Sequence, residues 1–171
     1  MIEITKAGTT LIFDENKLTF EMRRDQEAWR WAGNYVPKMI CEEGEFLFQD
    51  ASRISHEKAE NGTGSGILSV FEGFCVNGTE VPYTFETFVW IEEATGEVYF
   101  EWIPVKEEGL QVQKVLWPGE MEFEEAKEDW YTLLNQEQGM LIPNTWPEEL
   151  KPVIFDGFFG TAGGYMPWFG Q

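Results

Sequence analysis

Histidine and cysteine, on which much enzyme chemistry depends, are almost missing from this sequence. One histidine, His56, and two cysteines, Cys41 and Cys75, occur among 171 residues. A nucleophile activated by histidine would have to use His56, but its polar neighbours predict a solvent-facing loop or edge-strand position. Two cysteines are too few for a disulfide framework, so we expect free, buried thiols.

The sequence also lacks the patterns that hold metals and phosphate groups. It has no cluster of His and Cys ligands, and the acidic run 120–129 lacks the spaced Asp, Asn and Gly residues of a calcium loop. The glycines of residues 62–66 precede a predicted strand, whereas a phosphate loop precedes a helix. Glycoside hydrolysis needs two carboxylates about 5–10 Å apart, but the 31 acidic residues contain no pattern that singles out a pair. The sequence therefore assigns no catalytic residue, no metal ligand and no cofactor.

Basic residues are scarce as well. Twelve Lys and Arg stand against 31 Asp and Glu, which gives a formal net charge of -19 and a pI near 4.3. Such a chain repels phosphate-rich partners, so we expect neither nucleic acid nor an anionic membrane as a partner. No apolar run approaches a membrane span, and residues 1–6 do not begin a signal peptide. We therefore expect a cytoplasmic protein, although a trimmed chain would look the same.

Aromatic residues, by contrast, make up 16% of the chain and favour the pleated surfaces of strands. Short apolar alternations closed by turn residues recur along the sequence. Residues 11–13 and 18–22 predict a hairpin, and the alternation recurs at Phe46 and Phe48. The Asn77-Gly78 pair predicts a tight hairpin turn, because both positions tolerate positive φ.

The strand predicted after that turn, over residues 81–91, carries apolar residues on both faces. A sheet covered on both faces implies two packed sheets. The sequence therefore predicts an all-β fold, an antiparallel β-sandwich, as one domain over residues 1–171. The polar, glycine-rich segment 59–66 predicts a mobile loop, and residues 124–130 predict a surface turn because they lack an apolar stripe. Further strands are predicted over residues 98–103, 111–116, 120–123, 131–134 and 140–142.

Tryptophan stands beside proline and glycine in three segments near the C-terminus, residues 117–119, 138–147 and 164–170. A sugar offers an apolar C–H face and a rim of hydroxyls, so a site that binds it needs aromatic platforms beside carboxylates and amides. The alternative is that these rings belong to the core or to an interface with another domain. The candidates for carbohydrate or domain contact are Trp117, Gln138, Asn144, Trp146, Tyr165 and Trp168.

The last part of the chain, residues 151–171, has aromatic residues spaced by five glycines, without helical or strand periodicity. An exposed segment of this kind is expected either to be held against the body of the protein or to reach a partner domain.

The same three segments, after a run of antiparallel strands, resemble the N-terminal galactose-mutarotase-like β-supersandwich domain of certain multidomain bacterial glycoside hydrolases. The resemblance implies that the sandwich precedes and packs on a (β/α)₈ barrel, which supplies the catalytic acids. It also implies that residues 151–171 lead to that barrel. A free-standing mutarotase uses a histidine acid and a glutamate base, and His56 in a polar run is a poor match for the acid.

Three hypotheses remain open at this point. The first is a non-catalytic N-terminal domain of a glycoside hydrolase, with the barrel and carbohydrate as partners. The second is a stand-alone carbohydrate-binding module that uses Trp146 and Trp168 as stacking platforms. The third is a small sugar epimerase or hydrolase complete within this chain. The sequence specifies neither the sugar, the linkage and the oligomeric state, nor the strand order and the redox state of the cysteines.

Overall fold

The computed structural model of the chain describes residues 1–31, 36–119, 121–122, 131–134, 140–143, 145 and 169–170. The chain divides into two units, Met1–Glu122 and Phe123–Gln171, which are described separately. One domain over residues 1–171 stays a prediction.

The first sheet of unit Met1–Glu122 is antiparallel, with strand order β1-β2-β3-β4-β14. It contains the predicted N-terminal hairpin, in which Phe13 pairs with Phe20 and the two rings stack with centroids 4.7 Å apart. Asp14 closes the turn: its carbonyl accepts the amide of Leu18, and its Oδ1 accepts the amide of Asn16. The strands are β1 (Ile2–Lys6), β2 (Thr9–Asp14), β3 (Thr19–Arg24), β4 (Glu27–Trp31) and β14 (Met121–Glu122).

The second sheet is also antiparallel and has the order β12-β11-β8-β7. In β11, every second side chain from Tyr83 to Ile91 is buried on one face of the strand, and Phe88 and Trp90 are buried on the other, in line with the apolar residues predicted on both faces. A turn at residues 92–96 returns the chain to β12, which pairs with β11 along its length. The strands are β7 (Arg53–Glu60), β8 (Gly64–Glu72), β11 (Tyr83–Glu92) and β12 (Val98–Glu107).

A third, smaller sheet has the order β13-β5-β6, and a two-stranded hairpin joins β9 to β10. Asn77 and Gly78 have φ angles of 51° and 79°, which confirms the predicted turn. The return strand is interrupted, however: β10 ends at Glu80 and β11 begins at Tyr83. These elements are β5 (Lys38–Cys41), β6 (Gly44–Leu47), the 3-10 turn η1 (Phe48–Asp50), β9 (Cys75–Val76), β10 (Thr79–Glu80) and β13 (Val112–Leu116).

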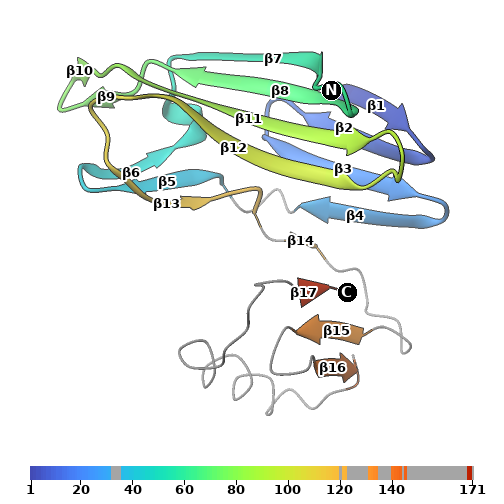
Figure 1. Ribbon diagram of the computed structural model, residues 1–171. Coiled ribbons are helices and arrows are strands. Elements are labelled where there is room, and N and C mark those ends of the chain that lie inside the picture. Colours follow the sequence, from blue (N-terminus) through green and yellow to red (C-terminus); the bar gives the residue numbers. More distant parts are fainter. Residues whose placement is uncertain are drawn as a thin grey trace. The chain divides into compact units, whose positions relative to one another are not determined.

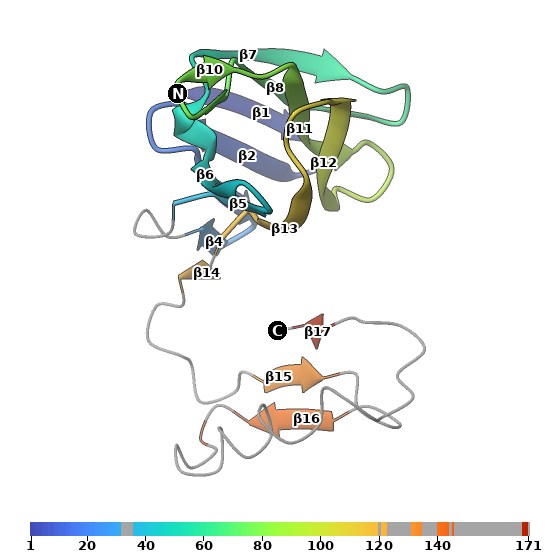
Figure 2. The same cartoon turned by 90° about the vertical axis from the view of Figure 1, so that its left-hand side faces the viewer.

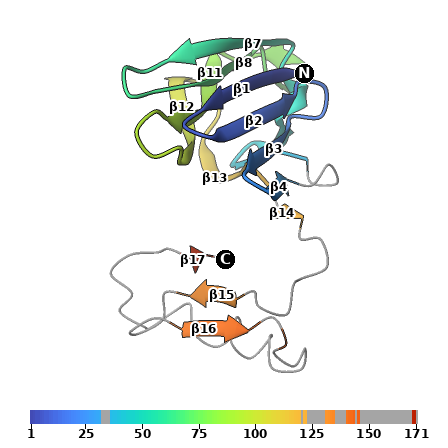
Figure 3. The same cartoon turned by 90° about the vertical axis from the view of Figure 1, so that its right-hand side faces the viewer.

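The first and second sheets form the two layers of an all-β antiparallel sandwich (Figure 1). Figures 2 and 3 show β1 and β2 on one side and β12 on the other, and Figure 1 shows β5 and β6 beside β13. One continuous core joins the three sheets, because Phe13 of β2, Phe85 of β11 and Met39 of β5 belong to the same buried cluster. These three side chains are at most 1% exposed.

Four details differ from the sequence-based expectations. The segment 59–66 is not a loop: β7 ends at Glu60, β8 begins at Gly64, and the turn between them is short because Asn61 Oδ1 accepts the amides of Thr63 and Gly64. Phe48 starts the turn η1 instead of continuing the strand. Both thiols are free, but Cys75 is exposed and Cys41 alone is buried. The second face of β11 carries the stacked rings of Phe88 and Trp90, and the described residues place no second sheet on it.

In the second unit, Phe123–Gln171, the described strands form an antiparallel sheet of order β16-β15-β17. The strand β15 (Tyr131–Leu134) coincides with its prediction, and β16 (Met140–Pro143) extends its prediction by one residue. The third strand, β17 (Phe169–Gly170), pairs with β15. The predicted turn at 124–130 and the rest of segment 151–171 lie outside the described residues.

Candidate functional site

Trp117 is the predicted contact residue that the structure describes, and it lies directly after β13. Its ring packs edge-on against Phe20 and Phe100, with centroid distances of 6.2 and 5.7 Å. The ring is partly buried at the margin of the core. This is the core role that the sequence left open as an alternative, and a contact of Trp117 with carbohydrate or another domain stays a prediction.

The other five predicted contact residues lie outside the described residues. They are Gln138, Asn144, Trp146, Tyr165 and Trp168. Whether the three aromatic segments converge on one surface therefore stays a prediction.

His56 lies on the edge strand β7, as predicted, but its ring points inward instead of facing solvent. It is half-buried and packs edge-on against Phe13 at 5.0 Å, while its Nδ1 lies 2.8 Å from Ser69 Oγ. Burial lowers the pKa of the imidazole, and Glu15 opposes this effect. Because Ser69 is 2% exposed, no substrate has access to the hydroxyl that such a pair would activate. The pair is a structural contact.

The described part of the chain holds no group of three or more His, Cys, Asp or Glu side chains arranged for a metal ion. No helix within it is long and apolar enough to cross a membrane.

A cavity of about 240 Å³ opens between β11, β12 and β13. Its aromatic lining comes from Tyr83 of β11 and Trp102 of β12, whose rings both pack against the buried Phe85. Tyr83 is 1% exposed, and Tyr83 Oη and Trp102 Nε1 are buried without a hydrogen-bond partner among the described residues. The remaining lining residues are Glu107, Leu110, Val112, Gln113 and Lys114.

The wall of this cavity, the connection from β12 to β13, is fixed on two sides. Gly109, with φ of 89°, lies so close to Val81 that a Cβ would come within 2.7 Å of the Val81 Cβ. The carbonyl of Gln111 accepts the amide of Glu42, and the amide of Gln111 donates to Glu43 Oε2. These contacts hold Leu110 in the core at 3% exposure, so the cavity is formed before any ligand binds.

The electrostatic setting keeps the Tyr83 hydroxyl protonated. Burial raises the pKa of the phenol to about 12, with smaller contributions from Cys41 and Glu107. Glu107 pairs with Tyr83 in the β11–β12 register, and it is exposed, as is Lys114. The cavity therefore has two buried neutral donors and an exposed mouth with charges of both signs.

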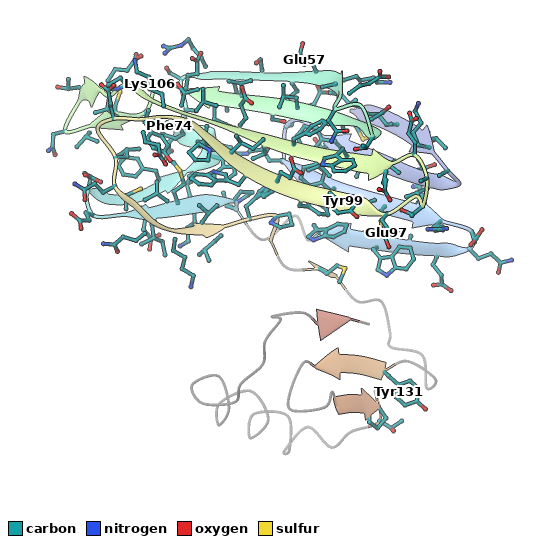
Figure 4. All side chains as sticks on the ribbon, in the orientation of Figure 1. Glu57, Phe74, Glu97, Tyr99, Lys106 and Tyr131 are labelled. Carbon is teal, nitrogen blue, oxygen red and sulfur yellow. The ribbon has the colours of Figure 1, made fainter. Side chains whose placement is uncertain are left out.

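A second aromatic feature lies on the outer face of the second sheet. Trp90 lies over Gly64 and Gly66, where a Cβ would overlap the indole or the adjacent backbone. Tyr99 stacks on Trp90, with centroids 4.5 Å apart and planes 12° apart. Tyr99 is 38% exposed and donates its hydroxyl to Glu97 at 3.0 Å; Figure 4 labels both residues. Its exposed ring face is a platform of the kind on which sugars stack.

Sequence reasoning placed Tyr83 and Trp102 in predicted strands but did not identify them as site residues. The available signal is chemical: Tyr and Trp bring a polar atom into the core, and such an atom needs a partner when it is buried. The sequence pattern does not reveal that β13 pairs with β5, and this pairing places the β13 wall of the cavity.

No protein-family model and no curated protein matches this sequence. Solved structures do. The alpha-N-acetylgalactosaminidase NagBb from Bifidobacterium bifidum, in its GalNAc complex, is 42% identical with a TM-score of 0.79, over 99% of this chain and 27% of that chain. Its Gal-NHAc-DNJ complex is 41% identical with a TM-score of 0.79, over 99% of this chain and 27% of that chain. Its ligand-free form is 40% identical with a TM-score of 0.74, over 99% of this chain and 26% of that chain. Over almost its whole length, this chain is thus similar to about a quarter of a glycoside hydrolase.

Proposed function

We propose that this chain is the non-catalytic N-terminal β-sandwich domain of a multidomain glycoside hydrolase and packs on a (β/α)₈ catalytic domain. The observation that carries the proposal is the unequal coverage in the comparison. The match spans 99% of this chain at 42% identity, but it accounts for 27% of the similar enzyme. The galactose-mutarotase-like supersandwich, which the sequence resembles, is the fold that we assign to this domain as part of the same proposal.

The architecture of the sandwich supports a structural role. The inner faces of the two sheets are filled by a continuous core rich in aromatic residues, and His56 of the Ser69–His56 pair packs against Phe13 of that core. We therefore place the catalytic acids of the whole protein outside this chain.

The name of the similar enzyme supports a substrate class for the whole protein. We propose that the whole protein hydrolyses α-linked N-acetylgalactosamine. The reason is that this chain is 42% identical to part of an alpha-N-acetylgalactosaminidase. In this proposal, Trp117, Trp146 and Trp168 contact either the catalytic domain or the carbohydrate.

The proposal is tested by comparing this chain with a longer natural chain that contains the barrel. We expect the longer chain to release 4-nitrophenol from 4-nitrophenyl N-acetyl-α-galactosaminide and the 171-residue chain to release none. In hydrogen-exchange mass spectrometry, peptides from residues 151–171 should exchange more slowly in the longer chain. Turnover by the 171-residue chain alone, or equal exchange in both chains, contradicts the proposal.

One observation favours a second candidate, a carbohydrate-binding module. Tyr99 presents an exposed ring face on a rigid sheet, stacked on Trp90. If this candidate is right, Tyr99→Ala weakens binding of the isolated chain to glycans, and the related change Val105→Ala does not, since Val105 is exposed on the same strand.

A further inference from the structure

The tripeptide Asn-Gly-Thr occurs twice in this chain, at residues 61–63 and 77–79, and each copy lies at the turn of a hairpin. Asn61 and Asn77 are both exposed, and a Cβ added at Gly62 or at Gly78 would meet nothing within 4 Å. Local sequence, access to solvent and space around the glycine are therefore alike at the two turns. A difference in their chemistry has to come from the contacts that each turn makes.

An asparagine that precedes glycine reacts with its own main chain. The glycine nitrogen attacks the side-chain carbonyl carbon of the asparagine, and the amide nitrogen leaves as ammonia with the proton that the glycine nitrogen loses. The product is a five-membered succinimide ring. Water opens this ring at the side-chain carbonyl, which gives aspartate, or at the main-chain carbonyl, which gives isoaspartate. The net reaction consumes one water and releases one ammonia, and glycine favours it because no side chain shields its amide.

Three hydrogen bonds hold the side chain of Asn61 away from this reaction. Its Oδ1 accepts the amides of Thr63 and Gly64 at 3.1 and 2.9 Å, and it also accepts the Thr63 hydroxyl at 3.1 Å. Such bonds from a side chain to the following main chain fix both in one turn conformation. The side-chain carbonyl of Asn61 therefore reaches the Gly62 nitrogen only after all three bonds break.

The side chain of Asn77 has no such restraint. Among the residues that the structure describes, no group forms a hydrogen bond with it. Its main chain is held by the turn itself, in which Asn77 and Gly78 have φ angles of 51° and 79°. The main chain between these two residues has to rotate before the ring closes, so the rate at Asn77 depends on how easily the hairpin opens.

The two hairpins differ in the ladder behind the turn. The β7–β8 ladder extends over Arg53–Glu60, and β8 also pairs with β11 on its other side. By contrast, β9 and β10 form a separate sheet of two strands with two residue pairs. Opening of such a short, exposed hairpin breaks few contacts, so its free-energy cost is low. Behind it, the amide of Val81 donates to the carbonyl of the buried Phe74, which confines the opening to the tip.

We propose that Asn77 is a site of spontaneous deamidation in the folded protein, and that Asn61 in the same tripeptide is protected. The aspartate product retains the turn, because Asp-Gly is also a favoured pair in two-residue hairpins. The isoaspartate product lengthens the main chain by one carbon and disrupts this turn. Both products add a negative charge near Glu80, which is paired with Arg53. The site does not depend on the proposed domain role.

The test incubates the full 171-residue chain at mildly alkaline pH, folded in buffer and unfolded in concentrated guanidinium chloride. A protease that cleaves after glutamate separates the two sites into peptides 61–72 and 73–80. Mass spectrometry follows the conversion of amide to acid, and isoaspartyl methyltransferase with labelled S-adenosylmethionine detects isoaspartate. In the folded chain we expect Asn77 to react at least about tenfold faster than Asn61, and in the unfolded chain we expect rates within about threefold.

The matched variant is Asn77→Gln, because a glutamine would have to close a six-membered ring, which forms more slowly. In this variant peptide 73–80 should contain no isoaspartate, and peptide 61–72 should react as it does in wild type. The proposal is overturned if the two asparagines react at equal rates in the folded chain or if Asn61 reacts faster. It is also overturned if Asn77 stays intact in the folded chain while the unfolded chain reacts.

Discussion

At the scale of single residues, the buried polar groups fall into two kinds. The hydroxyls of Thr9 and Ser69 are buried and have partners inside the protein, Gly96 and His56. The first bond joins β2 to the β11–β12 turn, 87 residues away, and the second joins the neighbouring strands β8 and β7. Tyr83 Oη, Trp90 Nε1 and Trp102 Nε1 are buried without a hydrogen-bond partner among the described residues. Bonds of the first kind fix the fold, and the atoms of the second kind all belong to the second sheet, in β11 and β12.

The inward-pointing His56 predicts a pH dependence of stability. Burial lowers the imidazole pKa in the folded state, whereas the unfolded chain has the ordinary value of 6.5. As the pH falls through 6.5, the unfolded state takes up the proton before the folded state does. His56 therefore contributes stability at neutral pH that is lost as the pH falls. We expect the free energy of unfolding to decrease between about pH 7.5 and pH 5.5, a window above the usual carboxylate pKa values.

Urea unfolding at several pH values measures this effect. In His56→Gln, which does not titrate, the free energy of unfolding should vary less over the same interval. The variant Glu15→Gln serves as the control for the neighbouring carboxylate, which raises the pKa of His56. Parallel pH profiles for wild type and His56→Gln would mean that the imidazole is not perturbed.

At the scale of strands, glycine residues of β8 make room for an aromatic ring of β11. Gly66 lies opposite Trp90 across the ladder, and the absence of a side chain there lets the indole lie against the strand. Tyr99 then stacks on the outside of the indole. On the outer face of the sheet, the rings of Phe88 and Tyr99 both stack on Trp90, which is 8% exposed.

The change Gly66→Ala tests this arrangement. The added Cβ would overlap the Val89 carbonyl and Trp90, so the two strands or the ring must move. We expect a loss of about 1–3 kcal/mol in the free energy of unfolding, the range usual for overpacking. Ser55→Ala, on the exposed part of β7, is the control and should change stability by less than about 0.5 kcal/mol. A Gly66→Ala protein as stable as wild type, with unchanged near-UV circular dichroism, would contradict the packing.

Local patterns predicted the strands well and the site poorly. The Asn77-Gly78 turn and the strand predicted over residues 81–91 follow from rules that act over a few residues. The glycines at 64 and 66 predicted a loop because composition does not reveal a ring packed from a neighbouring strand. The sequence did not predict the cavity for a similar reason. Its walls come from β11, β12 and β13, and β13 reaches this position because it pairs with β5.

At the scale of the whole molecule, the net charge is -19, and some of the described acidic side chains form ion pairs. Lys6 contacts Glu93 at 2.8 Å and Arg53 contacts Glu80 at 2.8 Å, both on the surface, where such pairs contribute little to stability. Burial of the aromatic core is therefore the main stabilising contribution. That core runs from Ile4 to Leu110, and its partly buried border includes Trp117, so it belongs to the unit Met1–Glu122.

A chain of residues 1–122 should consequently fold without residues 123–171. We expect its thermal midpoint to lie within about 3 °C of the full chain, because little of the core is lost. The control is a chain of residues 1–110, which lacks β13 and exposes the edge of β5, where Met39 and Cys41 are buried. Its midpoint should fall clearly below that of residues 1–122. Differential scanning calorimetry of the three chains measures these midpoints. If the midpoint of residues 1–122 falls well below that of the full chain, the prediction is contradicted, because residues 123–171 then stabilise the sandwich.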